Sequence, residues 1–132
     1  MILEIWIHGD LFDAYNFLLE LKHLPPVVHY WEPDDPNREN FGFNFQFYNA
    51  EAVDVIPFSF GRFLVANKEL LCAKQWFLPG TKKEIYICYE KEELVKKAGE
   101  KNSFMFVFKP GLMQLLAETG FVFYISREWT PT

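Results

Sequence analysis

Residues 41–48 read FGFNFQFY, the most regular alternation of apolar and polar side chains in the chain. In an extended backbone successive side chains point to opposite faces, so the phenylalanines at 41, 43, 45 and 47 share one face. The glycine, asparagine, glutamine and tyrosine between them share the other. This stretch therefore predicts a β-strand with one dry face buried in the core and one more polar face.

The segments on either side of this strand extend the same pattern. Residues 2–8 also alternate. The apolar set is Leu3, Ile5 and Ile7, and the more polar set is Glu4, Trp6 and His8. Residues 27–31 are short, apolar and β-prone, and a loop rich in proline and charge follows at 32–40. Proline and acidic residues favour exposed turns, so 27–48 predicts a hairpin with a long acidic tip.

The remaining segments predict helices that alternate with strands. Apolar spacing and stop signals predict helices at 10–23 with Asp10 as N-cap, 62–77, 91–98 and 110–119, and strands at 84–89, 103–108 and 121–125. We expect 103–108 to be central and 121–125 to be buried. The predicted fold is α+β, a mixed and mostly antiparallel sheet of about five to six strands packed with three to four helices.

Length and composition predict one domain over residues 1–132, with 127–132 as a tail. The chain has 132 residues, of which 50% are hydrophobic and 19% aromatic, enough for one large core. The first residues enter a strand pattern without a basic leader, and no apolar run is long enough to span a bilayer. We therefore expect a cytoplasmic protein without membrane contact, in which Cys72 and Cys88 are reduced packing residues.

Charge is distributed unevenly along the chain. Residues 1–61 hold ten acidic and two basic residues, whereas residues 62–132 hold eleven basic and eight acidic ones. The formal net charge is -5. A nucleic-acid-binding surface ordinarily carries a basic stripe, so we expect no nucleic-acid partner.

Motifs that bind phosphate, dinucleotides or zinc, and those of nucleophilic hydrolases, are absent from the sequence. The acidic loop at 34–39 lacks the glycine of a calcium-binding EF-hand loop, so we predict no metal site and no cofactor. A pocket that brings together His8, Asp10 and His29 stays open as an alternative, since acid-base sites are assembled from distant segments.

Aromatic residues stand beside acids in the first half of the chain. Aromatic anchors with like charge around them suit docking to a basic partner. The predicted partner-binding residues are Tyr30, Trp31, Glu32, Asp34, Asp35, Glu39, Glu51 and Asp54.

In these general features the chain resembles the immunity proteins that bacteria keep beside contact-delivered or polymorphic toxins. The first strand with its Gly9-Asp10 turn and helix, together with residues 109–125, also resembles a small bacterial domain family of unknown function. The first resemblance implies a non-catalytic protein that covers the basic active site of a cognate toxin, such as a nuclease, with an acidic surface. Two alternatives are a small ligand-binding or hydrolytic enzyme and an accessory protein that dimerises through exposed phenylalanines.

Overall fold

The computed structural model describes residues 1–34, 38–48, 56–88 and 110–125, which form an α+β fold. Its elements are, in chain order, β1 (Ile2–Gly9), α1 (Ala14–Glu20), β2 (Val28–Trp31), β3 (Phe41–Tyr48), α2 (Phe58–Ala66), α3 (Lys68–Cys72), the 3-10 turn η1 (Lys74–Trp76), β4 (Lys82–Cys88), α5 (Pro110–Thr119) and β5 (Val122–Ile125). Five strands and four α-helices in this part of the chain confirm the predicted fold class.

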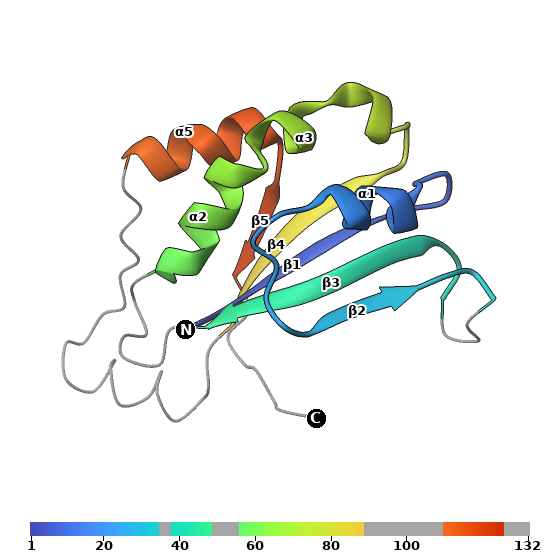
Figure 1. The fold of residues 1–132 in the computed structure, drawn as a ribbon, viewed down its shortest axis with the longest axis horizontal. Helices are drawn as coiled ribbons and strands as arrows, with labels where there is room; N and C mark the ends of the chain where they lie inside the picture. Colours follow the sequence, from blue (N-terminus) through green and yellow to red (C-terminus); the bar gives the residue numbers. More distant parts are fainter. Residues whose placement is uncertain (35–37, 49–55, 89–109, 126–132) are drawn as a thin grey trace.

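The strands form one mixed sheet in the order β2-β3-β1-β4-β5 (Figure 1). β1 lies in the middle, antiparallel to β3 on one side and to β4 on the other. β2 pairs antiparallel with β3, which confirms the predicted hairpin. β5 runs parallel to β4, so the chain crosses over between them, and α5 belongs to that crossover.

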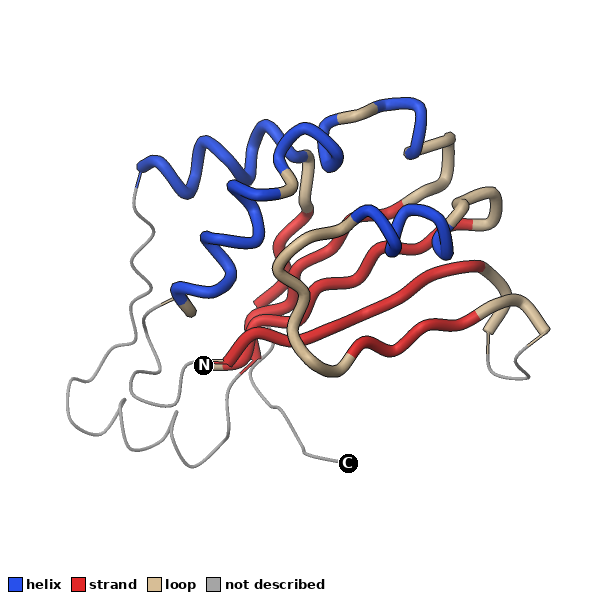
Figure 2. The backbone as a smooth tube through the Cα atoms, viewed as in Figure 1, coloured by secondary structure: helices blue, strands red, loops and turns tan. Residues whose placement is uncertain are grey.

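The described helices all lie on one face of the sheet (Figures 1 and 2). The core between helices and sheet holds the predicted dry faces of β1 and β3, and Leu3, Ile5, Ile7, Phe43, Phe45 and Phe47 are all buried. Aromatic rings join the layers: Phe45 meets Phe63 of α2 edge-on, with ring centroids 5.2 Å apart. Among the phenylalanines that the structure describes, Phe58 alone is exposed.

Two predicted helices have different bounds in the structure. α1 starts only at Ala14, and its N-cap is Asp13, whose carboxylate accepts a hydrogen bond from the Asn16 amide. The prediction that Asp10 caps this helix was wrong, because Gly9 to Phe12 form a turn closed by a backbone hydrogen bond.

The helix predicted at 62–77 is three short pieces that begin earlier, at Phe58. The break falls at Asn67, which is buried. Its side chain bonds the amide and the carbonyl of Lys22 as well as the Phe63 carbonyl, at 2.7–2.8 Å. An asparagine that satisfies backbone groups in this way competes with helix continuation.

The prediction of a buried strand at 121–125 was also wrong. β5 pairs only with β4 among the described strands and is therefore an edge strand, with Val122, Tyr124 and Ile125 exposed. Within and beside β5, Phe123 packs against the hydrophobic core and Phe121, just before the strand, is part of it. Gly120 precedes β5 with a φ of 72°, a left-handed conformation that glycine adopts freely at the end of a helix.

Lys83 joins β4 to the ends of two helices. Its ammonium group donates hydrogen bonds to the Leu71 carbonyl of α3 at 3.0 Å and the Thr119 carbonyl of α5 at 2.5 Å. It also lies 4.0 Å from the centre of the Phe77 ring. Cations favour helix C-termini, but burial lowers the pKa of Lys83 below its ordinary value. Lys83 therefore fixes the helix layer on the sheet.

The two cysteines are both free but differ in environment. Cys88 is buried at the end of β4, and burial raises its pKa to about 11. Cys72 is exposed, and its thiol donates to the Glu118 carbonyl at 3.3 Å. The prediction that both are core residues was therefore wrong for Cys72.

The helix predicted at 91–98, the strand predicted at 103–108 and the tail at 127–132 lie outside the described residues. Within the described ranges, no helix has the length and apolarity required to cross a membrane.

Candidate functional site

One end of the sheet brings together the two acidic segments of the first half of the chain. β1 and β2 both run antiparallel to β3, so Gly9 at the end of β1 and Trp31 at the end of β2 lie opposite the start of β3. The turn into α1 and the β2–β3 loop therefore leave the sheet at the same end (Figure 1). The first turn carries Asp10 and Asp13, and the loop carries Glu32, Asp34 and Glu39.

Tyr15 of α1 and Tyr30 of β2 connect these two segments. Their rings meet edge-on with centroids 6.1 Å apart. The Tyr30 hydroxyl donates a 2.8 Å hydrogen bond to the Glu32 carboxylate. Burial, the hydrogen bond to Glu32 and the negative charges of Glu32 and Asp13 raise the pKa of Tyr30 to about 12. We call the surface formed by Asp13, Tyr15, Tyr30, Glu32, Asp34 and Glu39 the acidic edge.

Apolar side chains continue the acidic edge along α1. Tyr15 and Leu19 are spaced four residues apart on α1 and expose 58% and 67% of their surfaces, and Leu11 in the turn before the helix exposes 68%. The opposite side of the same helix is buried through Ala14 and Phe17. The outer side of α1 therefore exposes Tyr15 and Leu19 together with Asn16 and Glu20, and it offers hydrophobic area beside the carboxylates.

The carboxylates of the acidic edge are not neutralised by lysine or arginine within the described residues. The ion pairs found there join His8 to Glu84 and Lys68 to Glu118, away from this edge. Asp13, Glu32, Asp34 and Glu39 are all exposed. An exposed set of like charges produces a negative potential that attracts a cationic surface.

The predicted partner-binding residues separate into three groups. Tyr30 and Glu32 are hydrogen-bonded to each other on the acidic edge, and Asp34 and Glu39 are exposed in the loop that leaves the sheet at the same end. Asp35, Glu51 and Asp54 lie outside the described residues. Trp31 is buried, and its ring faces the other side of the sheet from Tyr30, so it does not add exposed area to the edge.

Trp31 instead belongs to an aromatic cluster on the sheet face opposite the helices. Its ring lies 5.4 Å from that of Trp6, and the guanidinium of Arg38 lies over both, 4.4 Å from the Trp31 centroid and 5.5 Å from that of Trp6. Gly42 lies beneath Trp31, because a Cβ there would come within 2.6 Å of the indole and of His8. No pattern in the sequence indicates that Arg38, near the end of an acidic loop, lies over this cluster.

A chain of hydrogen bonds extends from this cluster across the sheet. Trp31 Nε1 donates to Asn40 Oδ1 at 3.0 Å, and Asn40 Nδ2 lies 3.0 Å from His8 Nδ1. His8 Nε2 lies 2.5 Å from Glu84 Oε1, and the Tyr86 hydroxyl donates to the other Glu84 oxygen at 3.3 Å. Because the Asn40 oxygen is already used by Trp31, its amide donates to Nδ1 and the His8 proton sits on Nε2.

This chain of hydrogen bonds determines what His8 can do chemically. Both ring nitrogens are engaged, so His8 has no free lone pair for a metal ion or a substrate proton. The three residues of the alternative pocket also do not meet: Asp10 is exposed in the turn after β1, and β3 separates His29 on β2 from His8 on β1. Among the described residues, no group of three or more histidine, cysteine, aspartate or glutamate side chains is placed to hold a metal ion.

The rest of this sheet face is also polar and aromatic. Glu4 accepts hydrogen bonds from the Trp6 indole and from Gln46, the latter at 2.7 Å. Tyr86 stacks on Tyr124 with ring centroids 4.9 Å apart. The predicted more polar faces of β1 and β3 are therefore confirmed, and the Glu4–Gln46 hydrogen bond joins them.

None of the known protein families, curated proteins or solved structures compared with the chain matches it.

Proposed function

We propose that this chain is a non-catalytic protein-binding module of the immunity type, which neutralises a toxin by covering its basic active site with the acidic edge. The observation that carries the proposal is the contact between Tyr15 and Tyr30 at the edge. It unites the acids before α1 with those after β2 in one exposed negative surface.

The composition of this surface matches what a protein interface requires. Aromatic side chains supply contact area at low entropic cost, and Tyr15 is 58% exposed. The apolar side chains of Leu11 and Leu19 would add the hydrophobic centre, with Asp13, Glu32 and Asp34 as the charged rim. A nuclease binds polyanions through a basic channel, so a negative surface of this kind would both speed encounter and compete with the substrate.

Within the described residues, His8 and Glu84 form the one histidine-carboxylate pair. The hydrogen bonds around His8 are more consistent with a structural role than with acid-base catalysis. A general base needs a nitrogen that is free to accept a proton, and His8 already uses Nδ1 to accept from Asn40. The His8–Glu84 pair is thus better suited to fixing β1 on β4 and to holding Asn40 under the aromatic cluster.

The experiment is a comparison of three forms of the chain as bait in a lysate of its native host. The wild type, Glu32→Lys and Glu69→Lys are immobilised, and retained proteins are identified by mass spectrometry. Glu69 is a matched control, because it is exposed on α3 and its substitution changes the net charge by the same amount. We expect a protein with a basic domain to be retained by the wild type and by Glu69→Lys and to be lost with Glu32→Lys.

Elution with salt provides the second measurement, because an interface between complementary charges weakens as ionic strength rises. Retention that is equal for Glu32→Lys and wild type, or that is insensitive to salt, would contradict the proposed use of the acidic edge.

A further inference from the structure

An apolar groove lies between α2 and α5, far from the acidic edge. These helices lie side by side in the helix layer (Figure 1). The groove has a volume of about 840 Å³. This volume falls within the range of small-molecule sites, which is about 300–1,000 Å³. The described residues that line it include Phe58, Gly61, Arg62, Val65, Leu112 and Leu115.

The groove exists because α2 is apolar on two faces. Phe60, Phe63 and Leu64 are buried against the sheet. Phe58 and Val65 line the groove about two helical turns apart. They expose 82% and 66% of their surfaces. Exposing large apolar side chains on a short helix is unfavourable in water, and such a concave apolar surface is typical of a ligand site.

Two glycines keep the groove open. Gly61 of α2 and Gly111 of α5 both line it, and a Cβ built on either would meet no described atom within 4 Å. Glycine is unfavourable inside a helix by about 1 kcal/mol relative to alanine. Gly61 is inside α2 and carries this cost, whereas Gly111 is in the first turn of α5. Both glycines leave room for another molecule.

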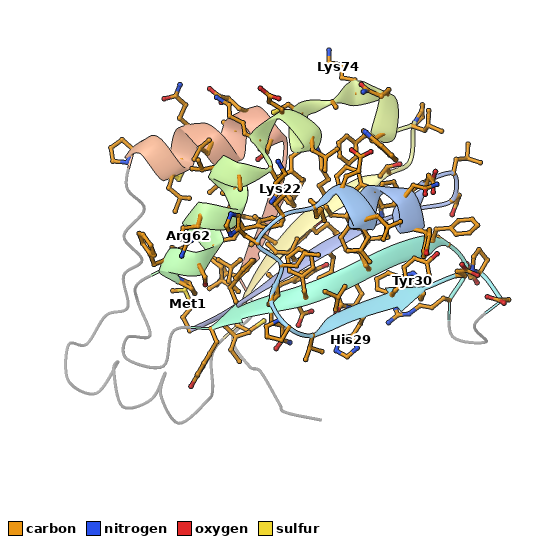
Figure 3. All side chains as sticks on the ribbon, viewed as in Figure 1. Met1, Lys22, His29, Tyr30, Arg62 and Lys74 are labelled. Carbon is orange, nitrogen blue, oxygen red and sulfur yellow. The ribbon has the colours of Figure 1, made fainter. Side chains whose placement is uncertain are left out.

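Arg62 is the one lysine or arginine among the described residues that line the groove, which also include His23. It is exposed on the groove side of α2, and no carboxylate is among the described residues that line the groove. Arg62 is in the middle of α2, and Figure 3 shows it well away from Lys74. A guanidinium beside an apolar surface recognises a carboxylate with two parallel hydrogen bonds.

We propose that the α2–α5 groove binds an amphiphile with one carboxylate headgroup and an unbranched apolar tail, that is, a fatty acid. The tail would pack on Phe58, Val65 and Leu115, and the carboxylate would pair with Arg62. This site is independent of the proposed partner-binding function, because it lies on other elements and uses other residues.

The test uses cis-parinaric acid, a fatty acid that fluoresces when it enters an apolar site, with the full-length chain. We expect saturable binding that decanoate displaces. Gly61→Leu and Gly111→Leu place a side chain in the groove, and each should raise the dissociation constant at least about tenfold. The matched control is Ser59→Leu, which adds the same side chain to α2 at a position that does not line the groove.

A second comparison isolates the role of the charge. Arg62→Gln should weaken binding of the acid about tenfold, as expected for loss of a charge-assisted pair, and leave binding of methyl parinarate unchanged. Lys74→Gln removes an exposed positive charge elsewhere and should change neither. Circular dichroism establishes that each variant is folded.

Three results would overturn the proposal. They are the absence of saturable binding to the wild type, equal binding by folded Gly61→Leu, and equal effects of Arg62→Gln on the acid and its ester. In the last case the groove would be an apolar surface for another occupant, such as a partner helix, without selection for a carboxylate.

Discussion

The Tyr30 hydroxyl donates a 2.8 Å hydrogen bond to the Glu32 carboxylate, two residues further along the chain. Tyr30 points to the helix side of the sheet, where it meets Tyr15, whereas its neighbour Trp31 points to the other side and is buried. The end of β2 therefore contributes a side chain to each of two surfaces. One is the exposed acidic edge, and the other is the aromatic cluster beneath Arg38.

The pKa of Tyr30 is a measure of the negative potential at the acidic edge. Burial, Glu32 and Asp13 raise its pKa from 10.0 to about 12. Ultraviolet titration of tyrosinate in the folded protein should show a late-titrating tyrosine that is lost in Tyr30→Phe, whereas Tyr86, whose pKa burial also raises, contributes to both titrations. Glu32→Gln should lower this pKa towards 10 without reaching it, because burial remains. A Tyr30 that titrates normally would show that the charges of the edge do not act together.

The same shift predicts how stability depends on pH. A tyrosine whose pKa is higher in the folded state than in the unfolded state holds its proton more tightly when folded. Its contribution is therefore complete below pH 10 and is lost as pH rises from 10 towards about 12. Urea unfolding in this range should show a smaller loss of stability for Tyr30→Phe than for the wild type. Equal slopes for the two proteins would contradict the assignment.

Gly42 tests the packing of the aromatic cluster. A Cβ at this position would lie 2.6 Å from both the Trp31 ring and the His8 Cβ, and 2.9 Å from the Ile7 carbonyl. We expect Gly42→Ala to destabilise the protein by about 1–3 kcal/mol, as overpacking of a tight site does, and to change tryptophan fluorescence. Gly61→Ala is the control, since its Cβ meets no described atom within 4 Å and should leave stability equal or slightly higher. Similar behaviour of the two variants would argue against the close packing.

The tautomer of His8 is a separate prediction. The hydrogen bonds to Asn40 and Glu84 place its proton on Nε2. Long-range proton-nitrogen NMR correlations on the neutral ring should show this tautomer in the wild type, and Asn40→Ala should weaken the preference for it. A proton on Nδ1 in the wild type would reverse the direction of the whole hydrogen-bond chain.

Asn67 links the segment after α1 to α2, and it stands at the break between α2 and α3. Its substitution tests the cause of that break. Its buried side chain makes three hydrogen bonds to backbone groups of Lys22 and Phe63. Asn67→Ala removes the partners of the Lys22 amide and carbonyl, whereas the Phe63 carbonyl keeps its bond from the backbone amide of residue 67. We expect a loss of about 3 kcal/mol in chemical denaturation. Asn16→Ala removes an exposed side-chain hydrogen bond to Asp13 and should cost only about 0.5 kcal/mol. Comparable losses would contradict the structural role of Asn67.

The sequence predicted the strands best where one face is dry. Phe43, Phe45 and Phe47 repeat every second residue, and burial on one side of a sheet produces this period directly. The helix at 62–77 was predicted less well, because its apolar spacing hides a break at Asn67 that depends on contacts with Lys22, distant in the chain. The edge position of β5 depends equally on pairing that composition does not encode.

The candidate site was predictable in part. Local clustering of acids identified Glu32, Asp34 and Glu39, because they are close in sequence. The contribution of Asp13, Tyr15 and the exposed Leu11 and Leu19 depends on how α1 packs beside β2. The role of Trp31 was missed because two adjacent residues of a strand face opposite ways, and only the pairing with β3 decides which faces the helices.

The most direct test of the proposed function is hydrogen exchange on the chain, free and bound to the basic protein that it retains from its host. The account predicts slowed exchange in residues 10–20 and 30–34, which carry the acidic edge and the outer side of α1, with no slowing on β4. Protection confined to β4 and β5 would contradict it.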